Sequence, residues 1–286
     1  MKSLRSLALA LVALLGITGC LQVEKIVKLN PDGSGTIEET VVISKAFAEE
    51  MKQITSGLGA LGGEKPATGA HPPAFNIMDE KKLKEAAGKM GEGVTFVSAK
   101  PITTATGEGF TAVYAFTDIR KINVSKDMND SMPKSGGPGL EMKPKTDKKE
   151  EPITFEFTKG APSSLTIKLP PPDLTAKKSA EKKDEPAEAA GGEEMAAMMA
   201  QQMFKDMKMT VAVEVAGKVA QTNAAHVAGS RVTLMEMDFN KVLANPGKFK
   251  ALVKAQPKSL GEAEAQLKGV DGIKIETQPK VTVKFQ

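Results

Sequence analysis

Apolar and polar residues alternate in several short stretches of the chain, and this pattern predicts β-strands with one buried and one solvent-facing side. Between residues 153 and 169, apolar side chains occupy every second position before and after a Gly-Ala-Pro-Ser turn. A second pair of alternating runs spans residues 22–44 and is interrupted by Pro31, Asp32 and Gly33. Proline and glycine set the backbone angles that tight turns need. Both segments therefore predict antiparallel hairpins.

Further strands are predicted along the rest of the chain. Residues 94–104 and 110–116 form one pair, joined through residues 107–109, and residues 210–215 form another strand. Residues 231–238 are apolar on both faces, which favours an interior strand. The last strand segment, residues 273–285, places Val281, Val283 and Phe285 on one face. Pro279 lies in this segment and predicts an edge position or a bend, because proline has no N–H for the ladder.

Helical periodicity appears in four segments. Residues 79–91 combine a capping Asp79, an apolar stripe and a terminating Gly91. Residues 44–54, 193–209 and 239–267 also repeat apolar positions at helical spacing, and the last of these is interrupted by prolines. The sequence therefore predicts an α+β fold: a mainly antiparallel β-sheet with helices packed on one side.

Two segments interrupt this pattern. Residues 126–151 and 170–192 are rich in Pro, Gly, Lys and acidic residues and have few large apolar side chains. They cannot bury enough surface to offset the entropy cost of ordering the chain. We expect two flexible insertions within one α+β domain spanning residues 20–286. A division into two subdomains near residue 150 is the alternative.

The first twenty residues predict a secretory signal. Lys2 and Arg5 precede an apolar run at residues 7–15, which is too short to span a bilayer. The run is followed by Ile-Thr-Gly and then Cys20. These four residues resemble the lipobox of bacterial lipoproteins; an ordinary leader with a chance cysteine is the alternative. The resemblance implies a signal peptide at residues 1–19 and acylation of Cys20, palmitate included. Leu21 after the cysteine implies the periplasmic side of the outer membrane.

Composition excludes several classes of chemistry. The chain has one Cys, two His, no Trp and a formal net charge of +4. Its charges are interspersed, without the basic stripe and stacking aromatics of a nucleic-acid binder. No phosphate-binding loop, metalloprotease motif or nucleophile elbow is present. Adjacent carboxylates such as Glu38 and Glu39 are expected in solvent, and His71 and His226 are expected in loops. We expect no catalytic residue, cofactor or metal.

The Met-rich segment at residues 193–209 is the candidate contact surface. Met199, Met203, Phe204 and Met207 fall on one broad arc of the predicted helix. Methionine side chains are flexible and adapt to irregular partners. The arc therefore suggests an adaptable apolar surface that contacts a lipid chain or a partner helix. An ordinary core helix after a linker explains the same pattern.

Two sets of residues resemble the LppM-like group of bacterial lipoproteins. The first set is Gly19-Cys20 followed by the Asp-Gly-Ser-Gly turn at residues 32–35, and the second is a Val-rich strand at residues 211–219 with Asn223, Gly229 and Val232. Members often carry a proline where this chain has Ala216. The resemblance implies an envelope-anchored α+β domain, with lipid or lipoglycan binding in at least one branch and no catalytic residues.

Three function classes follow from these observations. The first is a non-enzymatic lipoprotein, held in the membrane by its lipid, that binds a lipid or another amphiphile. The second is an interaction scaffold that docks a protein of a membrane complex. The third is a hydrolase built on a pair of carboxylates, which would need them 5–9.5 Å apart in a cleft. The aliphatic, Met-rich composition and the anchor favour the first class.

Overall fold

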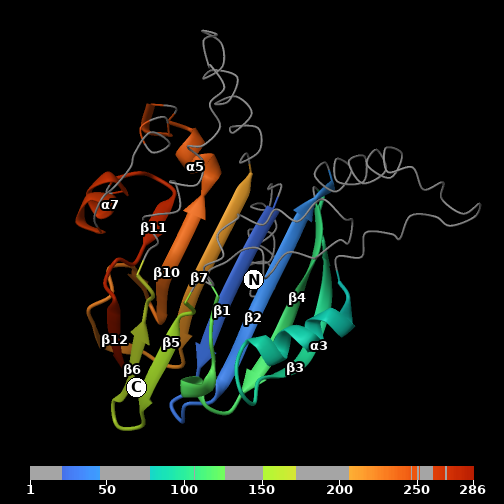
Figure 1. Cartoon of the computed structure of the whole chain (residues 1–286), viewed down its shortest axis with the longest axis vertical. Helices are drawn as coiled ribbons and strands as arrows, with labels where there is room; N and C mark the ends of the chain where they lie inside the picture. The colour runs from blue at the N-terminus through green and yellow to red at the C-terminus, as the bar shows by residue number, and fades with distance from the viewer. Residues whose placement is uncertain are drawn as a thin grey trace, which may run out of the picture.

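The structure, a computed structural model, describes residues 21–45, 78–105, 107–125, 151–171, 206–245, 247–249, 251, 260–267 and 269–286. In these ranges the chain forms two β-sheets and few helices (Figure 1). Every strand pairing in the described part is antiparallel except that of β1 with β7. The mainly antiparallel character is therefore confirmed, but the strands divide into two sheets rather than one.

The large sheet has eight strands. Its order is β11-β10-β7-β1-β2-β4-β3, and β9 pairs with β10. The strands are β1 (Leu21–Leu29), β2 (Gly35–Ser44), β3 (Thr95–Thr103), β4 (Gly107–Phe116), β7 (Met207–Val215), β9 (Val227–Ala228), β10 (Arg231–Asp238) and β11 (Ile273–Ile275). The parallel pair at the centre joins Leu21 to Met207 and Leu29 to Val215. Two segments far apart in the sequence thus form the middle of the sheet.

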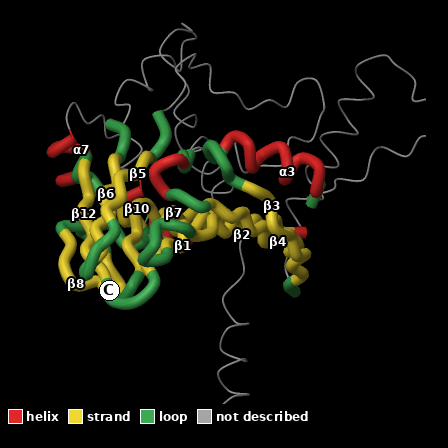
Figure 2. The backbone as a smooth tube through the Cα atoms, turned by 90° about the horizontal axis from the view of Figure 1, so that it is seen from below, coloured by secondary structure: helices red, strands yellow, loops and turns green. Residues whose placement is uncertain are grey.

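The small sheet has four strands in the order β5-β6-β12-β8. They are β5 (Thr154–Thr158), β6 (Ser163–Lys168), β12 (Lys280–Phe285) and β8 (Val219–Thr222). This sheet lies on the β10–β7 side of the large sheet (Figures 1 and 2). Its alternating apolar residues, including Ile167 and Val283, are fully buried and share one core cluster with β1, β2 and β4.

Two predictions about strand positions have opposite outcomes. β10 lies between β7 and β11, so the predicted interior position is confirmed. β12 also pairs on both sides, with β6 and β8, so the edge position inferred from Pro279 is wrong, whereas the alternative, a bend, is confirmed at Pro279 itself. Pro279 stands just before the strand, and its carbonyl accepts a hydrogen bond from the Leu169 N–H at 2.9 Å. The missing proline N–H therefore falls outside the β12 ladder.

The helices are short. α3 (Glu80–Lys89) begins at Asp79, whose carboxylate accepts hydrogen bonds from the N–H groups of Lys81 and Lys82, as predicted. α3 lies over β3 (Figure 2). α5 (Phe239–Leu243) and α7 (Leu260–Leu267) lie near β10 and β11 (Figure 1). A 3-10 helix, η1 (Ile119–Lys121), follows β4. Within the described ranges, no helix has the length and apolar character needed to cross a bilayer.

Some predicted boundaries were wrong. Residues 207–209 belong to strand β7 and not to a helix, as the prediction for residues 193–209 had them. Residues 107–109 open β4 instead of forming the turn before it. Residues 1–20, the predicted helix beyond residue 45, His71, residues 126–150 and residues 172–205 lie outside the described residues.

Candidate functional site

Three polar side chains share the core face of the large sheet near its centre. Lys25 on β1 is directly opposite Glu39 on β2 in the ladder. Lys25 Nζ lies 3.5 Å from Glu39 Oε1, and the two side chains are only 8% and 6% exposed. Tyr114 on β4 lies on the same face and is fully buried; it pairs with Ile37, two residues before Glu39. We call Lys25, Glu39 and Tyr114 the polar trio.

Strand alternation brings the polar trio to this face. Side chains two apart along a strand point to the same side of a sheet. Lys25 is therefore in phase with buried Val23 and Val27, and Glu39 is in phase with buried Ile37 and Val41. The ladder places Val211 of β7 next to Lys25 and Ala112 of β4 next to Glu39. Aliphatic side chains thus surround the ion pair within the sheet.

Two atoms of the polar trio lack hydrogen-bond partners. Among the described residues, neither Glu39 Oε1 nor the Tyr114 hydroxyl is hydrogen-bonded. Burial raises the pKa of Tyr114 well above its ordinary value, and the nearby Glu39 carboxylate raises it further. The phenol is therefore neutral at physiological pH and retains an O–H that can donate a hydrogen bond.

The polar trio has hydrogen-bonding capacity that the described residues leave unused. Buried polar atoms are nearly always hydrogen-bonded, and an unpaired one destabilises the fold by about 1–3 kcal/mol. Glu39 Oε1 can accept a hydrogen bond, and the Tyr114 hydroxyl can donate or accept one. Because Lys25 balances Glu39, the site has no formal net charge. The site therefore combines a buried ion pair with a neutral phenol.

The opposite face of the same strands is different. There Lys28 Nζ lies 2.7 Å from Glu38 Oε1, and the side chains are 43% and 30% exposed. Arg231 on β10 forms ion pairs with Glu24 at 3.2 Å and Glu214 at 3.4 Å. These ion pairs are solvated and satisfied, as is usual for charges on a sheet surface. They provide natural controls for the buried pair.

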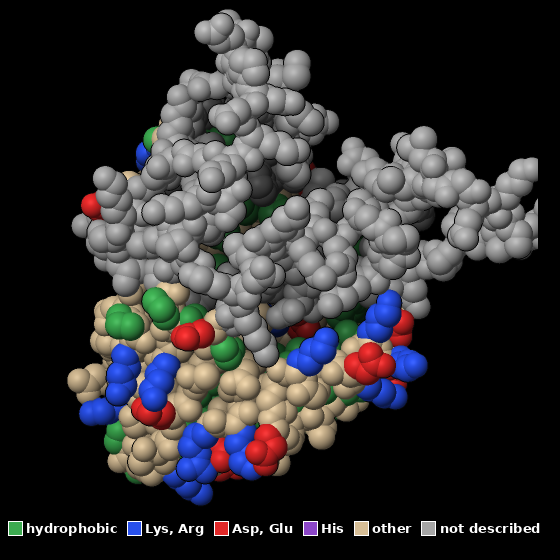
Figure 3. Space-filling view, in the orientation of Figure 1, with side chains coloured by type: hydrophobic (Ala, Val, Ile, Leu, Met, Phe, Trp, Pro, Cys, Tyr) green, Lys and Arg blue, Asp and Glu red, His purple; other side chains and the backbone are tan. Residues whose placement is uncertain are grey.

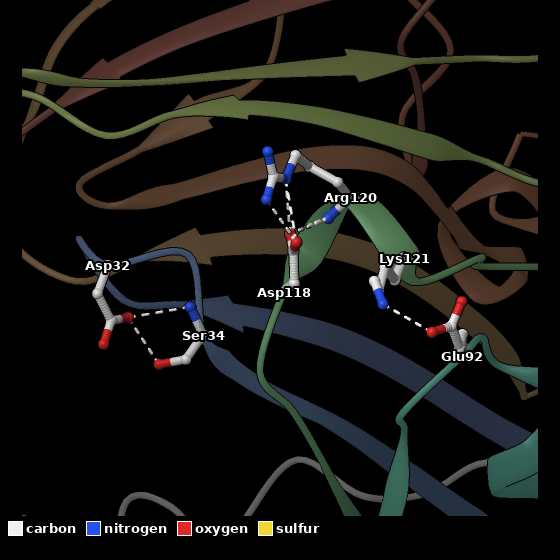
Figure 4. A network of polar contacts seen from close by, with 6 residues as sticks. All are labelled: Asp32, Ser34, Glu92, Asp118, Arg120 and Lys121. Atoms are coloured by element: carbon white, nitrogen blue, oxygen red, sulfur yellow. Dashed lines mark hydrogen bonds and ion pairs between the residues drawn. The ribbon is translucent and has the colours of Figure 1, made fainter.

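A second group of polar residues lies where β1 ends, and we call this the far end of the sheet (Figure 4). Asp32 accepts hydrogen bonds from the Ser34 hydroxyl at 2.6 Å and the Ser34 N–H at 2.9 Å, and these bonds lower its pKa. Asp118 caps η1 and contacts Arg120, while Lys121 pairs with Glu92 at 2.6 Å. Charged side chains of both signs gather along this edge (Figure 3).

These far-end contacts are local turns and caps. The hairpin turn predicted at residues 31–35 is confirmed, because Asp32 is used within it. In the described ranges, no group of three or more His, Cys, Asp or Glu side chains is placed to hold a metal. His226 lies in the loop between β8 and β9, where its carbonyl accepts a hydrogen bond from the Thr233 N–H.

Of the contact surface predicted from the sequence, the structure describes Met207. Cys20, Met199, Met203 and Phe204 lie outside the described residues. Met207 is the first residue of β7, next to Leu21, and its partly buried side chain packs against the core. It therefore lies on a strand and not on a helix.

The sequence reading missed the polar trio. Glu39 was expected in solvent with Glu38, but its side chain is buried. The relevant signal was present: Lys25 and Glu39 occupy the alternate positions that hold Val23, Val27, Ile37 and Val41. A charged residue in phase with a buried face needs a partner, and two such residues of opposite sign in one hairpin predict a buried pair.

Comparisons with known proteins give little further support. The chain matches no family model and no curated protein. Among solved structures it is similar to the NMR structure of the folded domain of Mycobacterium tuberculosis LppM, with 11% sequence identity and a TM-score of 0.28. The similarity covers 77% of this chain and 83% of that chain. The expected resemblance to LppM-like lipoproteins thus has a counterpart among solved structures, at a similarity too low to assign fold or function.

Proposed function

We propose that this chain is a non-enzymatic envelope lipoprotein that binds an amphiphile against the core face of its large sheet. In this proposal the polar trio makes hydrogen bonds to the polar group of the ligand, and the surrounding aliphatic residues contact its apolar part. The acyl groups on Cys20 hold the protein in the membrane, and Leu21 directs it to the periplasmic side of the outer membrane.

One observation carries the proposal: the Tyr114 hydroxyl and Glu39 Oε1, which faces Lys25 Nζ at 3.5 Å, are buried on one face of the sheet without hydrogen-bond partners among the described residues. A ligand hydroxyl or amide could satisfy both atoms, since it donates to the carboxylate and exchanges a hydrogen bond with the phenol. An internal water could do the same. The two occupants are distinguished by whether an amphiphile copurifies with the protein.

The scaffold alternative has less support in the described part of the chain. A docking surface needs a contiguous apolar patch. Among the described residues the exposed large apolar side chains are Val97 and Val227. Val97 is on β3, at one edge of the large sheet, and Val227 is on β9, which pairs with β10 toward the other edge. The Met-rich arc of Met199, Met203 and Phe204 remains a proposed second contact for the apolar part of the ligand.

Ligand retention tests the amphiphile. The protein is incubated with an envelope lipid extract, repurified and analysed by mass spectrometry, alongside Glu39→Gln and Tyr114→Phe. The matched control is Glu38→Gln, the same change on the opposite face of the same strand. We expect the wild type and the control to retain one lipid class and both trio variants to retain severalfold less. If the wild type retains none, or all four proteins retain equal amounts, the proposal fails.

Metabolic labelling tests the anchor separately. Cells expressing the wild type should incorporate labelled palmitate into the protein, and globomycin should block cleavage of the leader. The Cys20→Ser variant should take up no label and keep its uncleaved leader. Label in the Cys20→Ser protein would contradict acylation at this residue.

A further inference from the structure

The start of the first strand determines which end of the fold can lie near the membrane. β1 begins at Leu21, the residue that follows Cys20 in the sequence. Leu21 is already paired with Ile43 of β2 and with Met207 of β7. One residue spans at most about 3.6 Å. A lipid on Cys20 would therefore hold this strand end next to the bilayer, without a flexible linker.

Several other strands begin or end at the same end of the large sheet. β2 ends here at Ser44, β4 begins at Gly107, β7 begins at Met207 and β10 ends at Asp238. α5 follows directly after β10 (Figure 1). We call this edge the anchor end. The far end lies across the full length of β1, about 26 Å away at 3.3 Å per residue.

Exposed charges at the anchor end are mostly positive. Its exposed basic residues are Lys45, Lys208, Lys241 and Lys248. Of its acids, Glu108 and Asp271 are exposed, and Asp271 lies beside Gly272, whose carbonyl accepts a hydrogen bond from the Asp238 N–H. Asp206 and Asp238 are half-buried and already engaged, Asp238 in an ion pair with Lys241 at 3.6 Å. The Asp206 carboxylate accepts a hydrogen bond from Asn240, and Asp238 caps α5. Each lysine close to an anionic membrane surface strengthens binding by about fivefold.

We propose that the anchor end lies flat against the bilayer that holds the Cys20 lipid, with these four lysines at the level of the anionic headgroups. The fold then stands upright on the membrane, and the far end, with the Asp32 turn and the Asp118 cap, points away from it. This inference rests on the acylation of Cys20 in the proposed function. It does not depend on amphiphile binding.

Depth-dependent quenching tests this orientation. Cys20 is the single cysteine of the chain, and acylation consumes its thiol, so an introduced cysteine can be labelled alone. The lipidated protein is placed in vesicles that contain headgroup-nitroxide lipids. Fluorophores are attached to Lys45→Cys or Lys241→Cys at the anchor end, and to Lys159→Cys or Lys218→Cys near the far end. All four residues are exposed, so two independent variants report on each end.

We expect severalfold stronger quenching of both anchor-end labels than of both far-end labels. Equal quenching, or stronger quenching at the far end, would overturn the proposed orientation. If the wild type takes up no palmitate and does not float with vesicles, acylation itself is refuted and the orientation is refuted with it. The lipid-retention assay can fail without affecting this result, because no bound ligand is needed here.

A charge comparison tests the lysines. The unacylated Cys20→Ser protein, expressed without residues 1–19, is floated with anionic vesicles at low ionic strength, where surface attraction is least screened. Changing Lys45, Lys208, Lys241 and Lys248 to Gln should weaken binding by at least tenfold. The matched control changes Lys89, Lys159, Lys218 and Lys284 to Gln, and its binding should fall less than twofold. Equal losses in the two variants, or no binding by the unacylated parent, would overturn the lysine contact.

Discussion

Lys25 and Glu39 lie opposite each other on β1 and β2 with their charges buried, whereas Lys28 and Glu38 on the same strands form an exposed pair. Both are Lys–Glu pairs, but they occupy opposite faces of the sheet, and Lys28 reaches Glu38 diagonally because the ladder pairs Lys28 with Thr36. Removing a charge from water costs several kcal/mol, so the buried pair gives little net stability. The exposed Lys28–Glu38 pair is therefore an internal control for the buried Lys25–Glu39 pair.

Breaking the buried pair should destabilise the protein strongly. Lys25→Met leaves the Glu39 carboxylate buried without a counter-charge, and we expect a loss of about 3–5 kcal/mol in the free energy of unfolding. The double variant Lys25→Met/Glu39→Leu removes both charges and should recover most of this loss. Urea denaturation gives the free energy of unfolding of the wild type, of both variants and of a control variant, Lys28→Met. Lys28→Met should cost less than about 1 kcal/mol; a similar loss for Lys25→Met would mean that the buried pair is solvated.

The single tyrosine gives a direct reading of the polar trio under alkaline conditions. Tyr114 is the only tyrosine and the chain has no tryptophan, so ultraviolet absorbance follows one phenol. Its pKa is raised in the folded state, first by burial and then by Glu39, from an ordinary value of 10.0. We therefore expect no phenolate signal at pH 10 while the protein is folded.

The same shift makes folding stability depend on pH. Because the folded state holds the phenol proton more tightly than the unfolded state, the stability due to this proton is complete below about pH 10 and is lost as the pH rises above it. Tyr114→Phe should remove this dependence and leave stability near neutral pH unchanged or higher, since an unpaired hydroxyl is removed. A phenol that titrates near pH 10 in the folded protein would contradict its burial.

The cap of η1 should fail in acid. Asp118 accepts hydrogen bonds from the Arg120 side chain and N–H, and these bonds hold the pKa of its carboxyl below the ordinary 3.8. The stability from this carboxylate is present above about pH 4 and is lost as the pH falls further. Asp118→Ala should cost about 0.5–2 kcal/mol at neutral pH, and Asp118→Asn, which keeps a capping oxygen, should cost less. Equal losses in the two variants would show that the cap contributes nothing.

Local pattern predicted the hairpins but not their assembly. Turn residues and alternation identified the β1–β2 and β5–β6 hairpins, and the Asp79 cap identified α3, because each depends on neighbours in the sequence. The parallel pairing of β1 with β7 joins residues 21–29 to residues 207–215. No turn sets the register of such a pair, so nothing local in the sequence specifies it.

Predicting the candidate site from the sequence also requires strand pairings between distant segments. Lys25 and Glu39 could have been paired from the hairpin register alone, since the Asp-Gly turn fixes which residues face each other. Tyr114 joins them only because β4 pairs with β2 along its whole length. That pairing spans the 62 residues between Ser44 and Gly107, most of which form no predicted strand. Alternation places a residue on a face, but the strand order decides its neighbours.

Replacing Gly217 should be costly. It has φ +100°, a conformation that residues with a side chain rarely adopt, and an added Cβ would clash with the backbone carbonyl of Gln286. Lys218 and Gln286 exchange two backbone hydrogen bonds at this point, so the carbonyl is not free to move. Gly217→Ala should therefore destabilise the protein by about 2 kcal/mol or more.

Gly229→Ala is the control for Gly217→Ala, because Gly229 also has a positive φ, +63°, but an added Cβ meets nothing within 4 Å. Its free energy of unfolding should fall by only about 1 kcal/mol, the conformational cost of a positive φ in a residue with a side chain. Thermal unfolding of the two variants side by side separates steric contact from backbone strain. If the two losses are equal, the approach of Gln286 to Gly217 does not constrain the turn, and the backbone conformation alone explains why glycine is needed there.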